Sequence, residues 1–451
     1  MVSRSKGSIV SPAGVSRRAV LKYGATLGVA MPVLAACGGV STSGGGDGKL
    51  TFASTQFKPV EEADRFRAIL KDAYDGAVTY TPLETAQLTT QLRSQVQAKK
   101  VRINLVGGLH GDIATLGTDL LEDLSDLADD LAGDAKWPEE FTQLATLGTD
   151  RTYYIPWMQA TYVIAVHKDA LQWLPSGADV NNLTYDQFLD WAIAARQGNG
   201  GKPVFGLPAG PDGLLHRFLQ GHLYPSFTGG QVTTFTSAEA VTAWEWLREF
   251  WANCVPSSTR YAFMQDPLAA GEVMVAWDHV ARLLEAPREN PDQWQMVPTP
   301  AGPKGRGYMS ILAGLAIPKG APNQEQAKEL IRALSKPETQ LRVLADNGFF
   351  PVVEAELSGD LPPAVKLEAE AVRRTQDSED AILALPPVGL GAKDAQMNKV
   401  YQDSFTAIVL QNKDIKATLD AQAKVMQGLI DETKAACWAP DPASDGPCQV
   451  G

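Results

Sequence analysis

Short apolar runs alternate with longer amphipathic stretches in the first part of the chain. Residues 49–54, 78–81 and 101–106 form short runs of β-like composition, which predicts three strands. Residues 59–74 and 86–98 lie between them and have the character of helices. Because strands that alternate with helices favour a parallel sheet covered by helices, the pattern predicts an α/β fold.

The loops that follow these predicted strands carry polar side chains. Ligands of parallel sheets gather at the carboxyl ends of the strands, so the three loops should share one rim. Gln56, Glu84 and His110 lie in these loops and are candidate ligand-binding residues. The alternative for each of them is a solvated loop residue. Glycines at 107, 108 and 111 match no dinucleotide-binding or P-loop spacing.

The pattern changes where a proline separates two apolar β-like runs. Residues 153–157 contain Pro156, and residues 162–168 form the second run. A proline at this place favours an extended segment, which we expect to pass from one lobe of the protein to another. The chain has 451 residues, more than one hydrophobic core usually supports, so we expect two lobes.

The N-terminal segment predicts an export leader. It opens with Arg17-Arg18 in a basic stretch and continues as an apolar run of about fourteen residues, shorter than the roughly 20 of a membrane-spanning helix. Leu34-Ala35-Ala36-Cys37 at its end resembles the lipobox of bacterial lipoproteins. The resemblance implies cleavage before Cys37 and a lipid anchor on its thiol.

The leader also predicts that the mature protein lies outside the cytoplasm. We expect residues 1–36 to be removed and the Gly-rich residues 37–48 to form a flexible tether. The arginine pair resembles a Tat signal, but Val20 stands where Phe is usual, so Sec export stays an alternative. No second long apolar segment follows, which predicts a protein held at the outer face of the cell membrane by its lipid alone.

Charge and cysteine content narrow the function. Removing residues 1–36 takes away five of the 40 basic residues and leaves 35 against 52 acidic ones, a net charge of −17. Such a surface disfavours nucleic acid and anionic lipid as partners. Cys437 and Cys448 bracket a Pro-, Asp- and Ser-rich tail, where a disulfide in an oxidising exterior would stabilise by about 3 kcal/mol. Cys254 is expected to be a buried apolar residue.

Five stretches within residues 50–435 contain aromatic residues, in four of them together with proline or glycine: Tyr153–Lys168, Leu183–Phe188, Phe263–Trp277, Pro298–Lys319 and Gly348–Val352. In their order and spacing they resemble the family 1 extracellular solute-binding proteins, which are maltose-binding-protein-like. The chain departs from the family at His167-Lys168, which stands in place of Asn-Lys. It departs again at Tyr185 and Gln187, in a Thr-Trp-Asp-Glu-Phe motif.

The resemblance implies a two-lobed periplasmic-binding-protein-like fold of type II, in which each lobe is a mostly parallel sheet flanked by helices and chain crossings join the lobes. It places residues 49–156 and 312–351 in lobe 1, residues 157–311 and 352–435 in lobe 2, and residues 436–451 in a C-terminal tail. It also implies a monomer without cofactor that delivers a solute to the permease subunits of an ABC importer.

Carbohydrate is the cargo that the sequence favours. A sugar presents apolar faces and hydroxyl edges, so its site needs flat aromatic rings together with polar groups. Trp157 and Trp277 lie beside the predicted crossings and are expected to stack on the ligand. Asp278 is the candidate acceptor for sugar hydroxyls, or else a helix cap, and Tyr308 and Met309 at a later crossing complete the set. Because the rim candidates are acidic or neutral, a neutral sugar is favoured over a phosphate ester.

Two other functions stay open on the sequence. An exported sensor or adhesion lipoprotein would bind a ligand without transporting it. A chain with 52 acidic residues also offers paired carboxylates of the kind that a glycoside hydrolase uses. The five histidines show no metal-binding spacing, and no Gly-x-Ser-x-Gly motif is present. The sequence therefore favours a binding protein without catalytic residues and without a metal.

Overall fold

The computed structural model describes residues 49–58, 60–356 and 361–451. All of these residues belong to one compact unit, Gly46–Gly451. The leader, the tether and Cys37 lie outside the described residues. Within those residues, no helix combines the length and apolar character that crossing a membrane requires.

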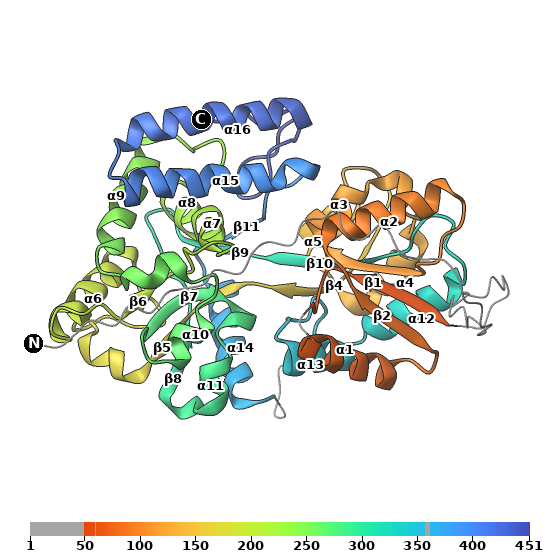
Figure 1. Ribbon diagram of the computed structural model, residues 1–451, viewed down its shortest axis with the longest axis horizontal. Coiled ribbons are helices and arrows are strands. Elements are labelled where there is room, and N and C mark those ends of the chain that lie inside the picture. Colours follow the sequence, from red (N-terminus) through yellow and green to blue (C-terminus); the bar gives the residue numbers. More distant parts are fainter. Residues whose placement is uncertain (1–48, 59, 357–360) are drawn as a thin grey trace, which may run out of the picture. The chain divides into compact units, whose positions relative to one another are not determined.

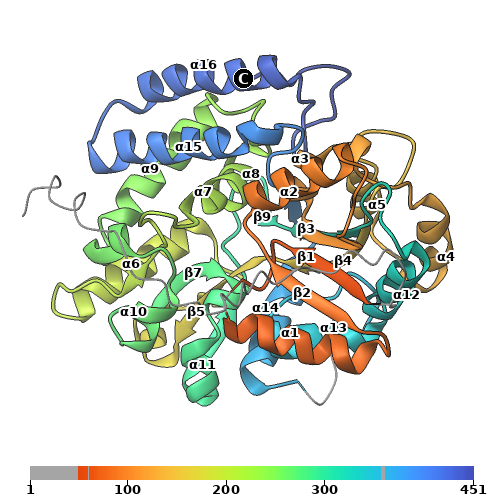
Figure 2. The same cartoon turned by 45° about the vertical axis from the view of Figure 1, so that its right-hand side comes forward.

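The first sheet begins with three parallel strands at or near the predicted apolar runs (Figure 1, Figure 2). The third strand begins at Leu105 rather than at residue 101 and includes residues 107–109, which were expected to be a loop. β1 (Leu50–Ser54) pairs in parallel with β2 (Val78–Pro82) and with β3 (Leu105–Leu109). β10 (Ile311–Ala316) and β4 (Ile155–Ala160) add antiparallel pairs, in the order β2-β1-β3-β10-β4. Adjacent side chains of a strand point to opposite faces, and Phe52 and Ala53 accordingly join two separate buried clusters.

Helices cover both faces of this sheet. Apolar residues of α1 (Val60–Ala73), α12 (Gln324–Leu334) and α13 (Pro337–Asn347) pack in the cluster that holds Phe52. Apolar residues of α2 (Thr85–Gln97), α3 (His110–Leu116) and α5 (Glu139–Ala145) pack in the cluster that holds Ala53. The turn η1 (Thr118–Leu120) and α4 (Ser125–Ala135) connect α3 to α5. This is the α/β arrangement that the sequence predicts for lobe 1.

The second sheet is smaller and is mainly antiparallel. β5 (Tyr162–His167) is flanked by β7 (Val275–His279) and β8 (Trp294–Val297), both antiparallel to it, and β6 (Phe205–Gly206) pairs in parallel with β7. The resemblance implied a mostly parallel sheet in each lobe, and the second lobe differs. The reason is directional, because β5 runs away from the first sheet whereas its partners run back toward it.

Helices and a short strand pair complete the second lobe. β9 (Arg306–Met309) and β11 (Ala381–Ala384) form a separate parallel pair. The Thr184 hydroxyl accepts a hydrogen bond from the Gln187 amide and caps one of the helices. The helices are η2 (Lys168–Trp173), α6 (Tyr185–Gly198), α7 (Leu215–Phe218), the π-helix η3 (Leu219–Leu223), α8 (Tyr224–Thr228), α9 (Ala238–Trp251), η4 (Pro256–Arg260), α10 (Gln265–Ala269), η5 (Val280–Arg282), α11 (Glu285–Glu289), η6 (Pro291–Gln293), α14 (Pro363–Gln376), η7 (Gly391–Lys393), α15 (Asp394–Phe405), the π-helix η8 (Thr406–Leu410) and α16 (Ile415–Thr433).

Within the described residues, three chain segments that connect the two sheets are hydrogen-bonded to one another. Thr161, between β4 and β5, donates its hydroxyl hydrogen to the carbonyl oxygen of Met309 at 2.7 Å. Gln159 and Phe350 exchange two backbone hydrogen bonds of 2.8 and 2.7 Å. The Ser310 hydroxyl donates to Gln159 Oε1 at 3.1 Å. These contacts place the first crossing at Thr161 and the second at Ser310.

The expected lobe boundaries shift accordingly. A boundary between residues 156 and 157 would cut β4, which stays paired with β10 up to Ala160. A boundary between residues 311 and 312 would cut β10. Pro156 lies inside β4, five residues before the crossing at Thr161. Its missing amide hydrogen is tolerated there because the register of β4 against β10 shifts next to it.

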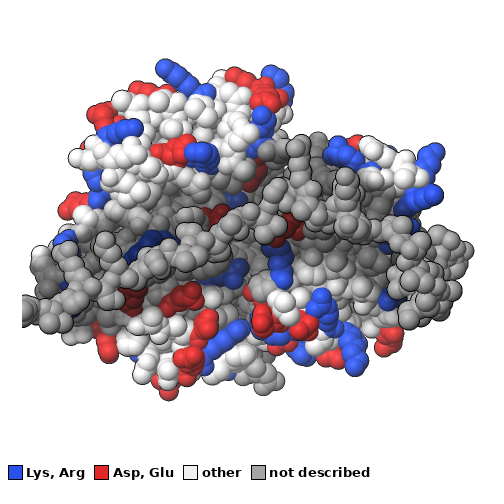
Figure 3. Space-filling model, viewed as in Figure 1, with Lys and Arg blue, Asp and Glu red and all other residues white. Residues whose placement is uncertain are grey.

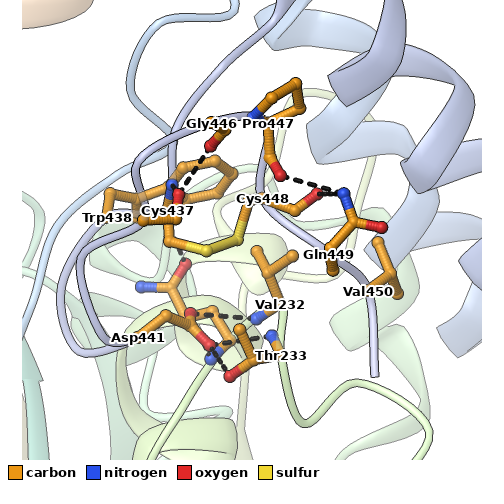
Figure 4. Close-up of a disulfide and its surroundings, with 12 residues drawn as sticks. Val232, Thr233, Cys437, Trp438, Asp441, Gly446, Pro447, Cys448, Gln449 and Val450 are labelled. Atoms are coloured by element: carbon orange, nitrogen blue, oxygen red, sulfur yellow. Dashed lines mark hydrogen bonds between the residues drawn. A yellow bond between two sulfur atoms is a disulfide. The ribbon is translucent and has the colours of Figure 1, made fainter.

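Specific side-chain contacts, rather than a helix, hold the C-terminal tail, residues 436–451, in place. Cys437 and Cys448 form a disulfide, and the Asp441 carboxylate accepts hydrogen bonds from the backbone amides of Gln231, Val232 and Thr233 at 2.8–3.0 Å (Figure 4). Trp438 is buried, and its indole N–H donates to Gln231 Oε1 at 3.1 Å. The tail thereby packs on the second lobe beside α15 and α16, which lie side by side.

Candidate ligand-binding site

A cavity of about 640 Å³ lies between the two lobes. Lobe 1 contributes the starts of α2 and α3, which follow directly after β2 and β3. Lobe 2 contributes Arg217, the loop 385–391 and the start of α15, and residues 310–312 of the second crossing lie between these walls. The cavity thus opens at the carboxyl ends of the parallel strands, where the topology predicts a ligand.

The wall in lobe 1 is organised by the carboxylate of Asp112. Asp112 Oδ2 accepts hydrogen bonds from Thr55 Oγ1 at 2.6 Å and from the Leu109 amide at 3.1 Å. Its Oδ1 accepts from Thr85 Oγ1 at 2.8 Å. Gly108 permits this close approach, because a Cβ there would lie 3.1 Å from the Asp112 Cβ. One side chain therefore ties together the ends of three strands.

His110 lies on the same wall and is uncharged at neutral pH. Its Nδ1 is 2.9 Å from the hydroxyl of the fully buried Tyr154. Its Nε2 is buried and has no hydrogen-bond partner among the described residues. Burial lowers the pKa of His110 to about 4, because a buried imidazolium ion loses its hydration.

The wall in lobe 2 presents a relay of polar side chains that ends at Arg217. An Nη1 hydrogen of Arg217 is donated to Gln220 Oε1 at 3.2 Å. Gln220 Nε2 donates to Asn398 Oδ1 at 3.1 Å, and Asn398 Nδ2 donates to Asp394 Oδ2 at 2.9 Å. Gln220 belongs to the π-helix η3, a helix type that is frequent at functional sites. The relay holds Arg217 at the cavity.

A second cavity of about 730 Å³ adjoins the first. Both cavities are lined by residues at the shared boundary, namely His110, Leu144, Leu385, Val388 and Gly391. The outer wall of the second cavity includes Trp438 and Asp441 of the C-terminal tail and Glu140 of α5. The loop 385–391 and the tail thus extend the interlobe space beyond the first cavity.

The structure places the two expected aromatic platforms in the core. Trp277 is only 1% exposed and stacks on Tyr162, with ring centroids 4.7 Å apart and planes 8° apart. Trp157 is also 1% exposed and packs against Phe57 and Phe66. Neither lines the cavities described above. Both residues belong to strands whose two faces are covered, so their rings are enclosed.

Asp278 and Met309 are buried as well. Asp278 is fully buried and accepts hydrogen bonds from the amides of Met264 and His279 at 2.8 and 2.7 Å. Burial raises the pKa of Asp278 to about 7, and the two amide bonds oppose that rise. Met309 is fully buried and packs on Gly221, whose added Cβ would lie 2.4 Å from the Met309 Cβ. These residues are structural in this conformation.

Of the remaining candidate ligand-binding residues, one lines the cavities and three do not. His110 lines both cavities, as expected. Gln56 is buried and donates from Nε2 to Thr55 Oγ1 at 3.0 Å. Glu84 is exposed and forms an ion pair with Lys58 at 2.8 Å. Tyr308 is half-buried and lines neither cavity, although burial and the nearby Glu140 raise its pKa.

Sequence reasoning missed Arg217 and the threonines of α2, Thr85, Thr89 and Thr90, which line the cavity. A usable signal for Arg217 was present, since it is one of few charged side chains in an otherwise apolar segment from Leu214 to Leu223. The described residues contain no cluster of His, Cys, Asp and Glu that could hold a metal ion. On the uncovered part of the face in Figure 3, basic and acidic side chains are interspersed.

Comparison with known proteins agrees with this architecture. Residues 64–368 match the sequence profile of a family described as bacterial extracellular solute-binding protein. Maltose-bound MalE3 of T. maritima superposes with a TM-score of 0.67 at 19% identity, covering 84% of this chain and 99% of that one. MalE of Xanthomonas citri gives 0.68 at 14% identity, covering 85% and 98%.

UgpB of Mycobacterium tuberculosis in complex with glycerophosphocholine is similar to the same degree, with a TM-score of 0.67 at 16% identity, covering 86% and 99%. At these identities the likeness shows the fold, and it confirms the two-lobed α/β class predicted from the sequence. No curated protein sequence matches this chain at a comparable level of significance.

Proposed function

Because this chain belongs to the family of bacterial extracellular solute-binding proteins, we propose that it captures a carbohydrate between its lobes for delivery to an ABC importer. The family is one of binding proteins, so the ligand is expected to leave chemically unchanged. The permease subunits of the importer are the proposed membrane partners, and the binding protein is proposed to act as a monomer.

One observation carries this proposal, namely the composition of the interlobe cavity. Thr85, Thr89 and Thr90 line one wall and offer hydroxyl oxygens as acceptors, because their hydrogens are donated to Asp112 and to two backbone carbonyls of α2. Arg217 offers N–H donors on the other wall. Between them lie apolar groups, including Ile311, Leu385 and the two prolines at 386 and 387. Apolar surface with a few convergent polar groups suits a solute that has C–H faces and hydroxyl edges.

The placement of the cavity supports a capture mechanism. Each lobe supplies part of the lining, so a ligand that touches both walls binds the closed form more tightly than the open form. The three bonded crossings at Thr161, Ser310 and Phe350 are the natural hinge for such closure. A micromolar dissociation constant requires only about −8 kcal/mol, which a few such contacts supply.

The anchoring part of the proposal rests on the sequence alone. Cleavage of residues 1–36 and lipidation of Cys37 would hold the protein at the outer face of the cell membrane, with residues 37–48 as the tether. For the lobes we propose the crossings at Thr161 and Ser310 as boundaries, in place of those expected from the sequence.

A calorimetric screen of the purified protein against mono- and oligosaccharides tests the proposed function. We expect one sugar class to bind with a micromolar or lower dissociation constant and to be recovered unchanged after prolonged incubation. Hydrolysis of the bound sugar would assign an enzyme instead. Binding without any loss of sugar import on deletion of the gene would assign a sensor or adhesion protein.

A further inference from the structure

The charged groups that line the first cavity are not equivalent. Asp112 uses both carboxylate oxygens for hydrogen bonds from Thr55, Thr85 and the Leu109 amide. Asp394 accepts from Asn398 at 2.9 Å. Arg217 has five N–H donors, and the only side-chain bond recorded for it within the described residues is that to Gln220. No carboxylate of the described residues lies within ion-pair distance of it. Both oxygens of Asp112 and one oxygen of Asp394 are thus occupied, while most of the Arg217 guanidinium remains available.

His110 adds a donor from the opposite wall. Burial raises the pKa of the Tyr154 hydroxyl, so this hydroxyl keeps its proton. It lies 2.9 Å from His110 Nδ1, and the imidazole tautomer decides which of the two atoms donates. In one tautomer the Tyr154 hydroxyl donates to Nδ1. A neutral imidazole that accepts at Nδ1 carries its hydrogen on Nε2. Nε2 is the buried atom without a partner, and its residue lines the cavity. An unmet donor of this kind costs free energy until an acceptor satisfies it.

The start of α2 adds backbone donors beside His110. The first amides of a helix have no acceptor within the helix. The N-cap residue Glu84 makes no side-chain bond to them and points instead to Lys58. Thr85 and Ala86, the first residues of this 13-residue helix, line the cavity. The helix N-terminus carries a partial positive charge, which favours a negatively charged group.

We propose that the carbohydrate bound in this cavity carries an anionic group, a carboxylate or a phosphate, and that Arg217 is the residue that selects it. The inference rests on the proposed function and narrows its substrate class from carbohydrates to sugar acids and sugar phosphates, in place of the neutral sugar that the sequence favoured. Arg217 from lobe 2 binds the anion through its planar fork of N–H donors. His110 and the first turn of α2 supply donors from lobe 1, so the anionic ligand also favours closure.

The acidic surface of the protein does not oppose this assignment. The net charge of the whole chain is −12. Screening by salt limits the reach of exposed charges to about 8 Å at physiological ionic strength. Hydrogen bonds inside the cavity act at contact distance and are screened much less. The local donors therefore decide which ligand is preferred.

Matched ligand sets test the proposal. Titration calorimetry of the purified protein compares each neutral sugar with its uronic acid and with its 6-phosphate. We expect an anionic member to bind at least about tenfold more tightly than its neutral parent, as for a charge-assisted bidentate contact. The carboxylate and phosphate arms distinguish the two sources of the charge.

Variants then locate the preference. Arg217→Gln should reduce the advantage of the anionic member to less than about twofold, and Arg217→Lys should retain part of it, because lysine keeps the charge without the fork. Arg93→Gln makes the same change of net charge at an exposed position of α2 outside the cavity and should leave the preference intact. His110→Gln keeps a donor near the Nε2 position and should bind more tightly than His110→Phe. Thermal melting shows that each variant is folded.

Three results are decisive. Equal affinity of neutral and anionic members would overturn the inference and leave the proposed function standing. A preference for the anion that survives Arg217→Gln would remove Arg217 from the site. Failure of every sugar, neutral or charged, to bind would contradict the proposed function itself and with it the substrate class.

Discussion

From the sequence, two regions of the molecule were both expected to bind the ligand, but only one of them borders the interlobe cavity. The strand ends of lobe 1, which carry Thr85, His110 and Asp112, border the interlobe cavity. The strands beside the first crossing carry Trp157, Tyr162 and Trp277, and these three rings are sealed in the core. Polar side chains at the carboxyl ends of parallel strands have an open edge in front of them, whereas aromatic side chains on doubly covered strands do not.

The difference shows which feature of a sequence locates a site in this fold. Topology places the ends of β1, β2 and β3 on one rim whatever their residues are. The aromatic rings beside the crossings instead fill the core where the chain passes from one sheet to the other. In this chain the rings stabilise the frame, and threonines, a histidine and an arginine face the cavity.

The largest expected effect is on protein stability, and it comes from a change at Trp277, a core residue that should not contribute to ligand binding. Truncation in Trp277→Ala should lower the free energy of unfolding by about 3–5 kcal/mol, because a fully buried indole leaves a large void. Chemical denaturation measures this loss. Ligand affinity of the folded fraction should stay within about twofold of the wild type. A stable variant that has lost its affinity would return Trp277 to the binding site.

The next effect concerns the tail that borders the second cavity. The double variant Cys437→Ser/Cys448→Ser opens a loop whose ends are 11 residues apart, which should cost about 3 kcal/mol in the chain-entropy model. Calorimetric melting is the measurement. The wild type in reducing agent should show the same shift, and a shift in the variant alone would point to lost packing of the side chains rather than to the cross-link.

A smaller, pH-dependent effect is expected at Glu368 in α14. This carboxyl is fully buried, both of its oxygens lack partners among the described residues, and burial raises its pKa well above the usual value. The unfolded group ionises above about pH 4.3, whereas the native group keeps its proton. The native state therefore binds more protons, and its stability falls as the pH rises through this range.

Glu368→Gln removes that titration. Between pH 5 and pH 8 the stability of the variant relative to the wild type should rise with pH, by about 1.4 kcal/mol for each pH unit over which only the unfolded wild type is ionised. Urea unfolding at the two pH values measures the difference. Other buried groups, including Asp278, titrate in both proteins and cancel. A pH-independent difference between variant and wild type would show that Glu368 is ionised in the native state.

The smallest expected effect is on the cavity wall. Thr85→Val keeps the shape of the side chain but removes its hydrogen bond to Asp112 Oδ1. We expect a loss of about 1 kcal/mol in ligand binding, with little change in unfolding. Thr142→Val removes a comparable hydroxyl contact on the exposed face of α5, outside both cavities, and should leave affinity unchanged. Equal losses of affinity in the two variants would show that the hydroxyl on the cavity wall contributes no more to binding than one on the exposed surface.

The local pattern of the sequence was sufficient for lobe 1. The predicted strand at 49–54 and helix at 86–98 correspond closely to β1 and α2, and the three expected strands share one sheet. His110 was found because a residue directly after a strand of a parallel sheet lies on the rim. These inferences depend on short-range periodicity and on one topological rule.

The rest depends on contacts between distant parts of the chain. Trp277 is enclosed by Tyr162, Phe218 and His222, none of them close to it in sequence. Arg217 is held through Gln220, whose partner Asn398 is 178 residues away from it. The periodicity of a strand does not show whether helices cover both of its faces, because those helices come from distant parts of the chain. A single sequence therefore gave the rim of the site and not its opposite wall.

The most direct test of the account fills the cavity without touching the core. Ala86 is exposed, lies in the first turn of α2 and lines the cavity, whereas its neighbour Gln87 is exposed and does not line it. Calorimetry with the tightest-binding carbohydrate should show no detectable binding to Ala86→Trp and nearly unchanged binding to Gln87→Trp, both being folded. Undiminished binding to Ala86→Trp would contradict the claim that the ligand occupies this interlobe cavity.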